Sequence, residues 1–112
     1  AAHGATCAAL LPHVMAVNLQ VIRGRDSNVD LAARFDEIGR ILTGNPAAVG
    51  EDGVAWLMDL CEAMEVPSLG SHGLTHADFP ALIEKAIVSS SMKGNPVQLT
   101  KAEMTEILKR AM

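Results

Sequence analysis

The sequence predicts an all-α fold of about five helices in one domain. Apolar residues recur at spacings of three and four behind recognisable capping residues, and no stretch alternates apolar and polar residues over the length of a strand. The only aromatic residues are Phe35, Trp56 and Phe79. A core without large rings is built from aliphatic side chains and methionine, which suits packed helices better than sheets.

The first predicted helix covers residues 5–22 and is apolar on all sides. Its length is that of a membrane span, but Pro12, His13, Asn18 and Gln20 lie within it, so we expect a buried helix and no membrane contact. No basic segment precedes it, and we therefore expect no signal peptide.

The second and third helices are predicted from caps and spacing. Ser27 is the expected cap of a helix that ends at Gly44, with Asp30 in the reciprocal capping position. The third helix spans residues 51–66, before Pro67, and begins with two acidic residues. The expected buried faces are Leu31, Phe35, Ile38 and Leu42 on the second helix, and Val54, Leu57, Cys61 and Met64 on the third.

Capping boxes also mark the last two helices. Thr75 and Asp78 have the spacing of such a box before a helix that continues to residue 88, and Thr100 and Glu103 repeat it before a helix over 101–112. A polar connector, residues 89–98, joins them. The expected buried faces are Phe79, Leu82, Ile83, Ala86 and Ile87, followed by Met104, Ile107 and Leu108.

Composition excludes several classes of function for these residues. The net charge is −4 and lysine and arginine form no cluster, so we expect no nucleic-acid partner. Neither a G-x-G-x-x-G nor a P-loop motif occurs, and no nucleotide site is expected within this chain. Cys7 and Cys61 are far apart and form no C-x-x-C pair, which predicts free thiols and a cytoplasmic location.

The histidines are the remaining candidates for chemistry. His72 and His76 are four residues apart, but Gly73 and the cap at Thr75 lie between them, so we expect them in a loop. His13 is expected to be a buried, hydrogen-bonded imidazole. His3 leads directly into the apolar helix, which a small bundle cannot cover, and this indicates that the chain begins inside a larger core.

Three stretches carry a family resemblance. "HGATCAALLPHVMAVN" (residues 3–18) resembles the HG-x-x-x-A-x-LLPHV-x-x-x-N signature of the iron-dependent (group III) alcohol dehydrogenases. "LGSHGLTHADFPALIEKAI" (69–87) and "GNPVQLTKAEMTEILKRAM" (94–112) resemble that family's late helix-turn-helix and terminal helix. The resemblance implies that residues 1–112 are a fragment of the all-helical C-terminal domain of a dehydroquinate-synthase-like two-domain enzyme, without the nucleotide-binding domain.

The resemblance also implies a site and a reaction. His3 matches the last of four metal ligands, an aspartate and three histidines, whereas His13 matches a histidine that is not a ligand. Ser91, in the connector, is a candidate substrate-pocket residue. The implied enzyme uses Fe²⁺ or Zn²⁺ to transfer hydride between a small alcohol or aldehyde and NAD(P).

For the isolated chain we expect no activity, no tightly bound cofactor, and self-association through helix 5–22. Two alternatives remain at this stage. One is a non-catalytic helical interaction module, and the other is an autonomous metal-binding bundle in which His72 and His76 join His3.

Overall fold

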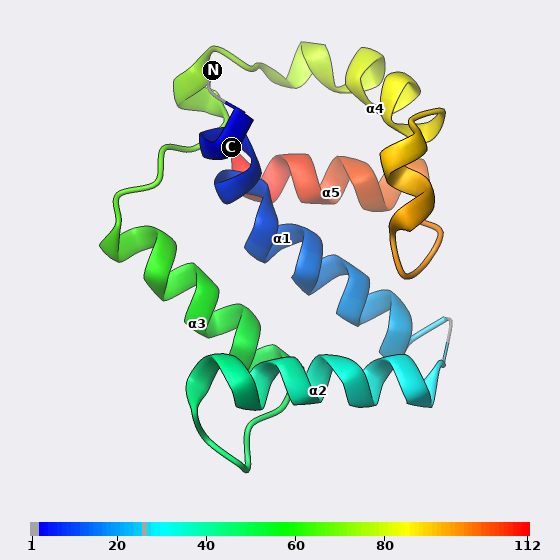
Figure 1. The fold of residues 1–112 in the computed structure, drawn as a ribbon. Coiled ribbons are helices and arrows are strands. Elements are labelled where there is room, and N and C mark those ends of the chain that lie inside the picture. The colour runs from blue at the N-terminus through cyan, green and yellow to red at the C-terminus, as the bar shows by residue number, and fades with distance from the viewer. Residues whose placement is uncertain (1–2, 26) are drawn as a thin grey trace.

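The computed structural model describes residues 3–25 and 27–112. Within these ranges it contains five α-helices, three short 3-10 turns and no strand, which confirms the all-α prediction (Figure 1). The helices are α1 (His3–Arg23), α2 (Val29–Thr43), α3 (Gly50–Ala63), α4 (Phe79–Ile87) and α5 (Lys101–Ala111). The 3-10 turns are η1 (Gly70–His72), η2 (His76–Asp78) and η3 (Ser90–Gly94).

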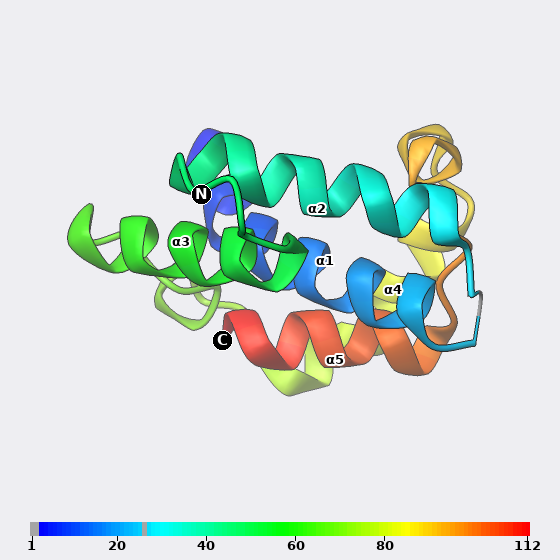
Figure 2. The ribbon, with the colours of Figure 1, turned by 90° about the horizontal axis from the view of Figure 1, so that it is seen from below.

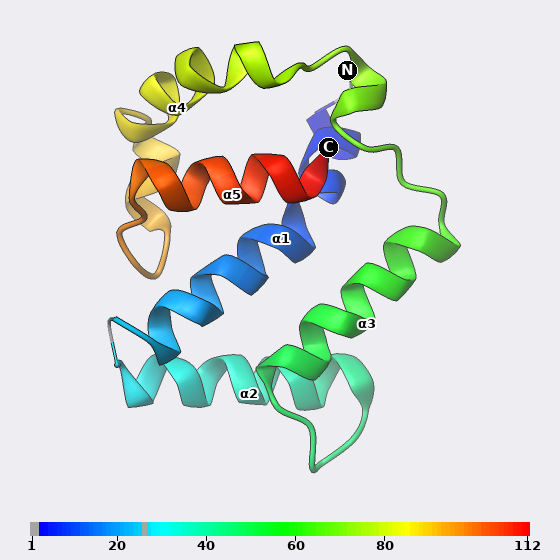
Figure 3. The same cartoon turned by 180° about the vertical axis from the view of Figure 1, so that it is seen from behind.

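Helix α1 is the central element of the fold. It packs against α2, α3 and α5, while α4 packs on α5. Seen from below, α1 lies between α2 and α5 (Figure 2), and the view from behind shows α3 beside the other flank of α1 (Figure 3). The molecule is a slab of 41 × 32 × 20 Å.

The core gathers around the second half of α1. Leu19 and Ile22 are the largest fully buried side chains. By length and composition alone α1 could cross a membrane; 44% of its most apolar window is buried inside this fold, where α2, α3 and α5 pack on the helix. The buried cluster around it consists of Met15, Val17, Leu19, Val21, Ile22, Phe35, Val54, Phe79, Ile83, Val97, Leu99, Met104 and Ile107.

A proline inside α1 leaves one carbonyl group for another element. Pro12 has no N–H, so the carbonyl of Ala8, four residues earlier, lacks its usual helical donor. The thiol of Cys61 on α3 donates to this oxygen, with Sγ 3.7 Å away. Cys61 therefore satisfies a main-chain group that the sequence of α1 would otherwise leave unpaired.

The start of α2 corrects one prediction. Asn28, not Ser27, is the N-cap, and its side-chain oxygen accepts from the N–H of Leu31 at 3.0 Å. Ser27 has a positive φ of 47° and its hydroxyl donates to the carbonyl of Gly24. The Ser27–Asp30 box is absent because the chain turns sharply at Ser27, which shifts the cap by one residue.

Close backbone contacts at two glycines determine where α2 and α3 cross. They also show that the predicted buried faces of these two helices were partly wrong. A Cβ on Gly39 would lie 2.1 Å from the carbonyl oxygen of Val49, and one on Gly53 would lie 3.0 Å from Cα of Gly39. Because the backbones approach at these positions, α2 turns Gly39 inward and leaves Ile38 39% exposed. Met64, predicted on the buried face of α3, is 67% exposed because it lies past the helix end.

The last two helices follow their predicted caps. The N–H of Thr75 donates to Asp78 and the N–H of Thr100 donates to Glu103, each over 2.8 Å. A 3-10 turn occupies residues 76–78, so α4 begins at Phe79. Phe79 and Ile83 are buried, but Leu82 and Ile87, also predicted to be buried, are 38% and 41% exposed. The face that α4 presents to α5 is thus narrower than predicted.

Candidate functional site

The first turn of α1 presents two side chains that can bind metals. His3 and Cys7 are both exposed, and Sγ of Cys7 lies 3.5 Å from Nε2 of His3. The two residues share a helix face because they are four positions apart. The sequence predicted Cys7 to be a free thiol, and the structure confirms that it forms no disulfide.

His13 lies further along the same helix in a different environment. It is half-buried and lines a small cavity of about 160 Å³ with Cys61 and Arg110. Burial, and secondarily the nearby Arg110 charge, lower the pKa of His13. Within residues 3–25 and 27–112 the half-buried imidazole makes no hydrogen bond, so the prediction of a buried, hydrogen-bonded histidine was wrong.

The other two histidines lie in the loop before α4, as expected. His72 is the last residue of η1 and is followed by Gly73, which has a φ of 90°. His76 is the first residue of η2, and the centroid of its ring lies 4.9 Å from that of the Phe79 ring. Among the described residues no three histidine, cysteine or acidic side chains form a group that could hold a metal ion. The structure therefore does not bring His72 and His76 together with His3.

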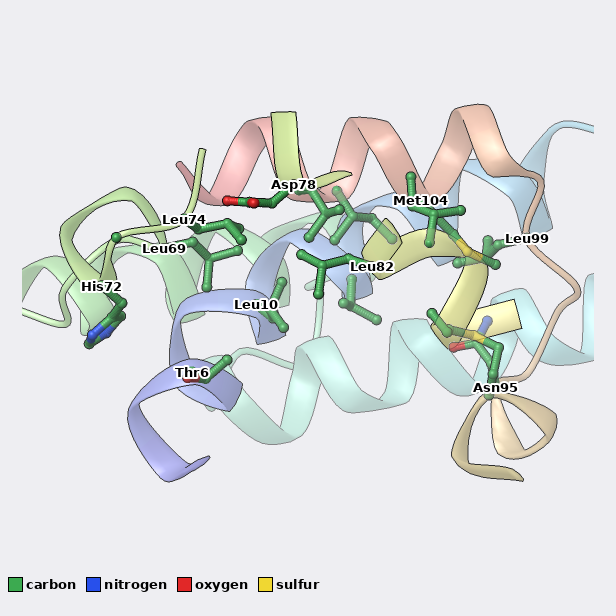
Figure 4. Close-up of a pocket in the computed structure, with 17 residues that line it drawn as sticks. Thr6, Leu10, Leu69, His72, Leu74, Asp78, Leu82, Asn95, Leu99 and Met104 are labelled. Carbon is green, nitrogen blue, oxygen red and sulfur yellow. The ribbon is translucent and has the colours of Figure 1, made fainter. Parts of the chain in front are cut away.

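An apolar cavity of about 550 Å³ opens beside the first half of α1 (Figure 4). Its walls come from α1, α4, α5 and the loop that carries η1. Polar groups are confined to its ends: Thr6, His72 and Asp78 lie toward one end and Asn95 toward the other. The apolar lining consists of Leu10, Val14, Leu69, Gly73, Leu74, Leu82, Ile83, Ala86, Met92, Leu99, Met104, Ile107 and Leu108.

The connector before α5 is fixed to α1 by a pair of amides. Asn18, only 4% exposed, and Asn95 exchange two hydrogen bonds of 2.9 Å, and Asn95 also donates to the carbonyl of Val97. Ser91, the candidate pocket residue, is exposed in η3, where its N–H donates to the hydroxyl of Ser89. It does not line the apolar cavity, and its role stays a prediction.

Ion pairs connect the C-terminal end of α1 to α2 and α3. Arg23 donates to Glu51 over 2.6 and 2.9 Å and also pairs with Asp36, which accepts the N–H of Gly50. The Gly50 hydrogen bond, followed by the Arg23 interaction, lowers the pKa of Asp36. These contacts join α1, α2 and α3 and leave the first turn of α1 as the open end.

The sequence of this helical chain matches that of a class of enzymes. The chain matches the Fe-containing alcohol dehydrogenase family, C-terminal, over residues 1–112. It therefore belongs to the iron-containing alcohol dehydrogenase family and represents part of its C-terminal domain.

Particular relatives support the same assignment. Alcohol dehydrogenase 4 from two strains of Saccharomyces cerevisiae is 31% identical over 110 residues, which are 97% of this chain but 27% of the relative. The chain thus spans about a quarter of the length of these relatives. No solved structure gives a significant match.

Proposed function

We propose that this chain is the C-terminal, metal-side part of an NAD(P)-dependent alcohol dehydrogenase that transfers hydride between a small alcohol or aldehyde and the nicotinamide. The observation that carries the proposal is the family match over all 112 residues. The exposed His3, in the first turn of a helix anchored along the rest of its length, supports it. The nucleotide-binding domain would lie outside the present chain.

The residues present fit one part of a metal site. His3 offers an accessible imidazole from a helix, which is a suitable ligand for Fe²⁺ or Zn²⁺ when neutral. Because no group of three ligand-type side chains exists among the described residues, most ligands would come from elsewhere in the full-length protein. When bound, the metal would polarise the alcohol oxygen and stabilise the negative charge from which hydride departs.

The role of this chain is then to position His3. Two side chains in the second half of α1 fix the helix in the fold: Asn18 is hydrogen-bonded to Asn95, and Arg23 to Glu51. These contacts would keep the position of the first turn constant relative to the rest of the chain. Rigid support of ligands is what fixes metal geometry in catalytic sites. His13 lies ten residues further along, away from this turn, and contributes no ligand in the proposal.

The isolated chain is proposed to be inactive and to bind metal weakly, because it supplies too few ligands for a stable site. Self-association through residues 5–22 remains part of the proposal. Among the large apolar side chains of the described α1 only Leu11, at 51%, is classed as exposed, whereas α2 and α3 expose several, so the apolar surface that α1 offers for self-association is small. The two free cysteines agree with the proposed cytoplasmic location.

The test is alcohol-dependent reduction of NAD⁺ or NADP⁺ by the full-length protein that contains this chain. We expect turnover that disappears after chelation and returns with Fe²⁺ or Zn²⁺, while the 112-residue chain shows none under any metal. A helical interaction module predicts instead that the full-length protein shows no metal-dependent turnover with any small alcohol.

A further inference from the structure

We propose that the apolar cavity beside the first half of α1 is the seat of an apolar helix from the residues that precede this chain in the full-length protein. This seat depends on the proposed place of the chain in the C-terminal part of a longer enzyme, but not on the proposed reaction. The cavity is then an interface within one polypeptide rather than a site for a small molecule.

The cavity exposes apolar side chains that its own walls do not cover. Leu82 on α4 is 38% exposed, and Leu10, Val14 and Leu74 are only half-buried although they line the same cavity. The cavity has a volume of about 550 Å³, whereas packed protein interiors contain few voids larger than a water molecule. Apolar surface of this extent marks a place where another apolar surface is buried.

One wall of the cavity follows a helix face. Thr6, Leu10 and Val14 succeed one another at intervals of four residues on α1, so they line the cavity over about 12 Å, which is about two helical turns. Leu82 on α4 and Ile107 on α5 belong to the other walls (Figure 4). Rows of side chains at this spacing can interdigitate with those of another helix, as packed helices do. A helix of two or three turns is therefore the expected occupant.

The polar groups of the lining favour an apolar occupant over a polar ligand. Among the described residues that line the cavity there is no lysine or arginine, and Asp78 is the one carboxylate. That carboxylate already accepts hydrogen bonds from the N–H and the hydroxyl of Thr75. The amide of Asn95 is bonded to Asn18 and to the carbonyl of Val97. A strongly polar molecule would lose its hydration here and find few unused partners.

The position of the cavity favours the preceding residues as the source of the helix. The match covers 27% of the yeast relatives and the matching family region is the C-terminal one, so most residues of a relative precede the matched ones. Thr6, at one end of the cavity, follows the start of α1 at His3 by three residues. A segment that precedes His3 in a longer protein is therefore tethered near this end, which raises its local concentration above that of a free partner.

The experiment uses the full-length protein with photo-leucine, a leucine analogue that forms cross-links on illumination, in place of leucine. Leu10 and Leu82 report on the cavity, whereas Leu11 and Leu60 are exposed but do not line it and serve as internal controls. Mass spectrometry of the digested protein locates the cross-links. We expect both cavity leucines to be joined to one segment that precedes His3, and the two control leucines not to be joined to that segment.

An equal mixture of unlabelled and isotope-labelled protein identifies the other occupants. Cavity cross-links that combine the two labels would show that a second copy fills the cavity, and they would overturn the inference. Cavity leucines that are joined only to residues within this chain would overturn it too, because the cavity would then be empty or filled by a small molecule.

Thiol protection measures the same burial in a second way. Iodoacetamide should modify Leu82→Cys in the folded full-length protein at least about tenfold more slowly than Lys85→Cys, because a seated helix must first move away. Lys85 is the matched control, since it is exposed on the same helix and does not line the cavity. Circular dichroism checks that both variants are folded, and equally fast modification of the two would contradict the seat.

Turnover of the same photo-leucine protein separates this inference from the proposed function. Alcohol-dependent reduction of NAD⁺ or NADP⁺ without cavity cross-links to a preceding segment would overturn the seat alone. Those cross-links in a protein without metal-dependent turnover would overturn the proposed reaction and leave the seat standing.

Discussion

At its first turn α1 exposes His3 and Cys7, whose only described side-chain partners are each other. Its second half is buried, with the amide of Asn18 paired to that of Asn95 and the charge of Arg23 paired to acidic residues on two other helices. The two ends of α1 therefore have different roles. The closed end fixes the helix in the fold, and the open end presents ligand-type groups to whatever lies beyond it.

The largest expected effect is on the glycine contacts that support the closed end. Gly39→Ala should destabilise the chain by about 1–3 kcal/mol, because its Cβ would lie 2.1 Å from backbone oxygen of Val49 and the helices must separate. Gly4→Ala, at the open end, has no atom within 4 Å of its Cβ and should cause no loss. Urea unfolding of both variants measures the difference, and equal stabilities would contradict the contrast between the ends.

The amide pair is the next test. Asn18→Ala leaves the half-buried amide of Asn95 with one fewer partner and should lower the free energy of unfolding by about 1–3 kcal/mol. Because the two side chains share the same hydrogen bonds, the double variant Asn18→Ala/Asn95→Ala should cost less than the sum of the two single losses. Strictly additive losses would show that the pair does not join the connector to α1.

The smallest effect depends on pH. The hydrogen bond from Arg25, followed by that from the N–H of Thr100, lowers the pKa of Glu103 from 4.5 to about 2. Ionised Glu103 therefore stabilises the fold above about pH 4.5, and this contribution is lost as the pH falls toward 2. Since Arg25 is 49% exposed, the contribution is about 0.5–1 kcal/mol.

Glu103→Gln should thus be less stable than the unaltered chain at neutral pH and equally stable near pH 2, as measured by urea unfolding at each pH. Glu106→Gln is the control, because its pair with Arg110 lies within α5 and is worth only about 0.2–0.5 kcal/mol. A Glu103→Gln deficit that persists at pH 2 would mean that Arg25 is not its cause.

Local sequence signals predicted much of this fold. The boxes at Thr75 and Thr100 depend on residues three positions apart, so they could be recognised without tertiary information. The part of the buried face of α2 around Gly39 could not be predicted in this way. The helical periodicity is read from large apolar residues and ignores glycine, although α2 and α3 meet at Gly39. The cap at Asn28 was missed because the positive φ of Ser27 depends on how the chain leaves α1.

The candidate site was predicted in part and for a different reason. The position of His3 came from a family resemblance, and the structure adds that the side chain is exposed. Its proximity to Cys7 follows from the start of the helix at residue 3, which the predicted range of 5–22 excluded. The solvent access of His13 depends on how α1, α3 and the end of α5 meet, and no local pattern encodes that arrangement.

The central claim is that the open end of α1, and not its middle, holds the metal. The most direct measurement is the metal content and alcohol-dependent NAD(P)H formation of the full-length protein with His3→Ala or His13→Ala. We predict that His3→Ala loses most of its metal and at least about 100-fold in turnover, more than the loss of a mere outer partner. His13→Ala should keep both, since His13 belongs to no group of three ligand-type side chains among the described residues. Retention of metal and turnover by His3→Ala, with their loss in His13→Ala, would contradict the account.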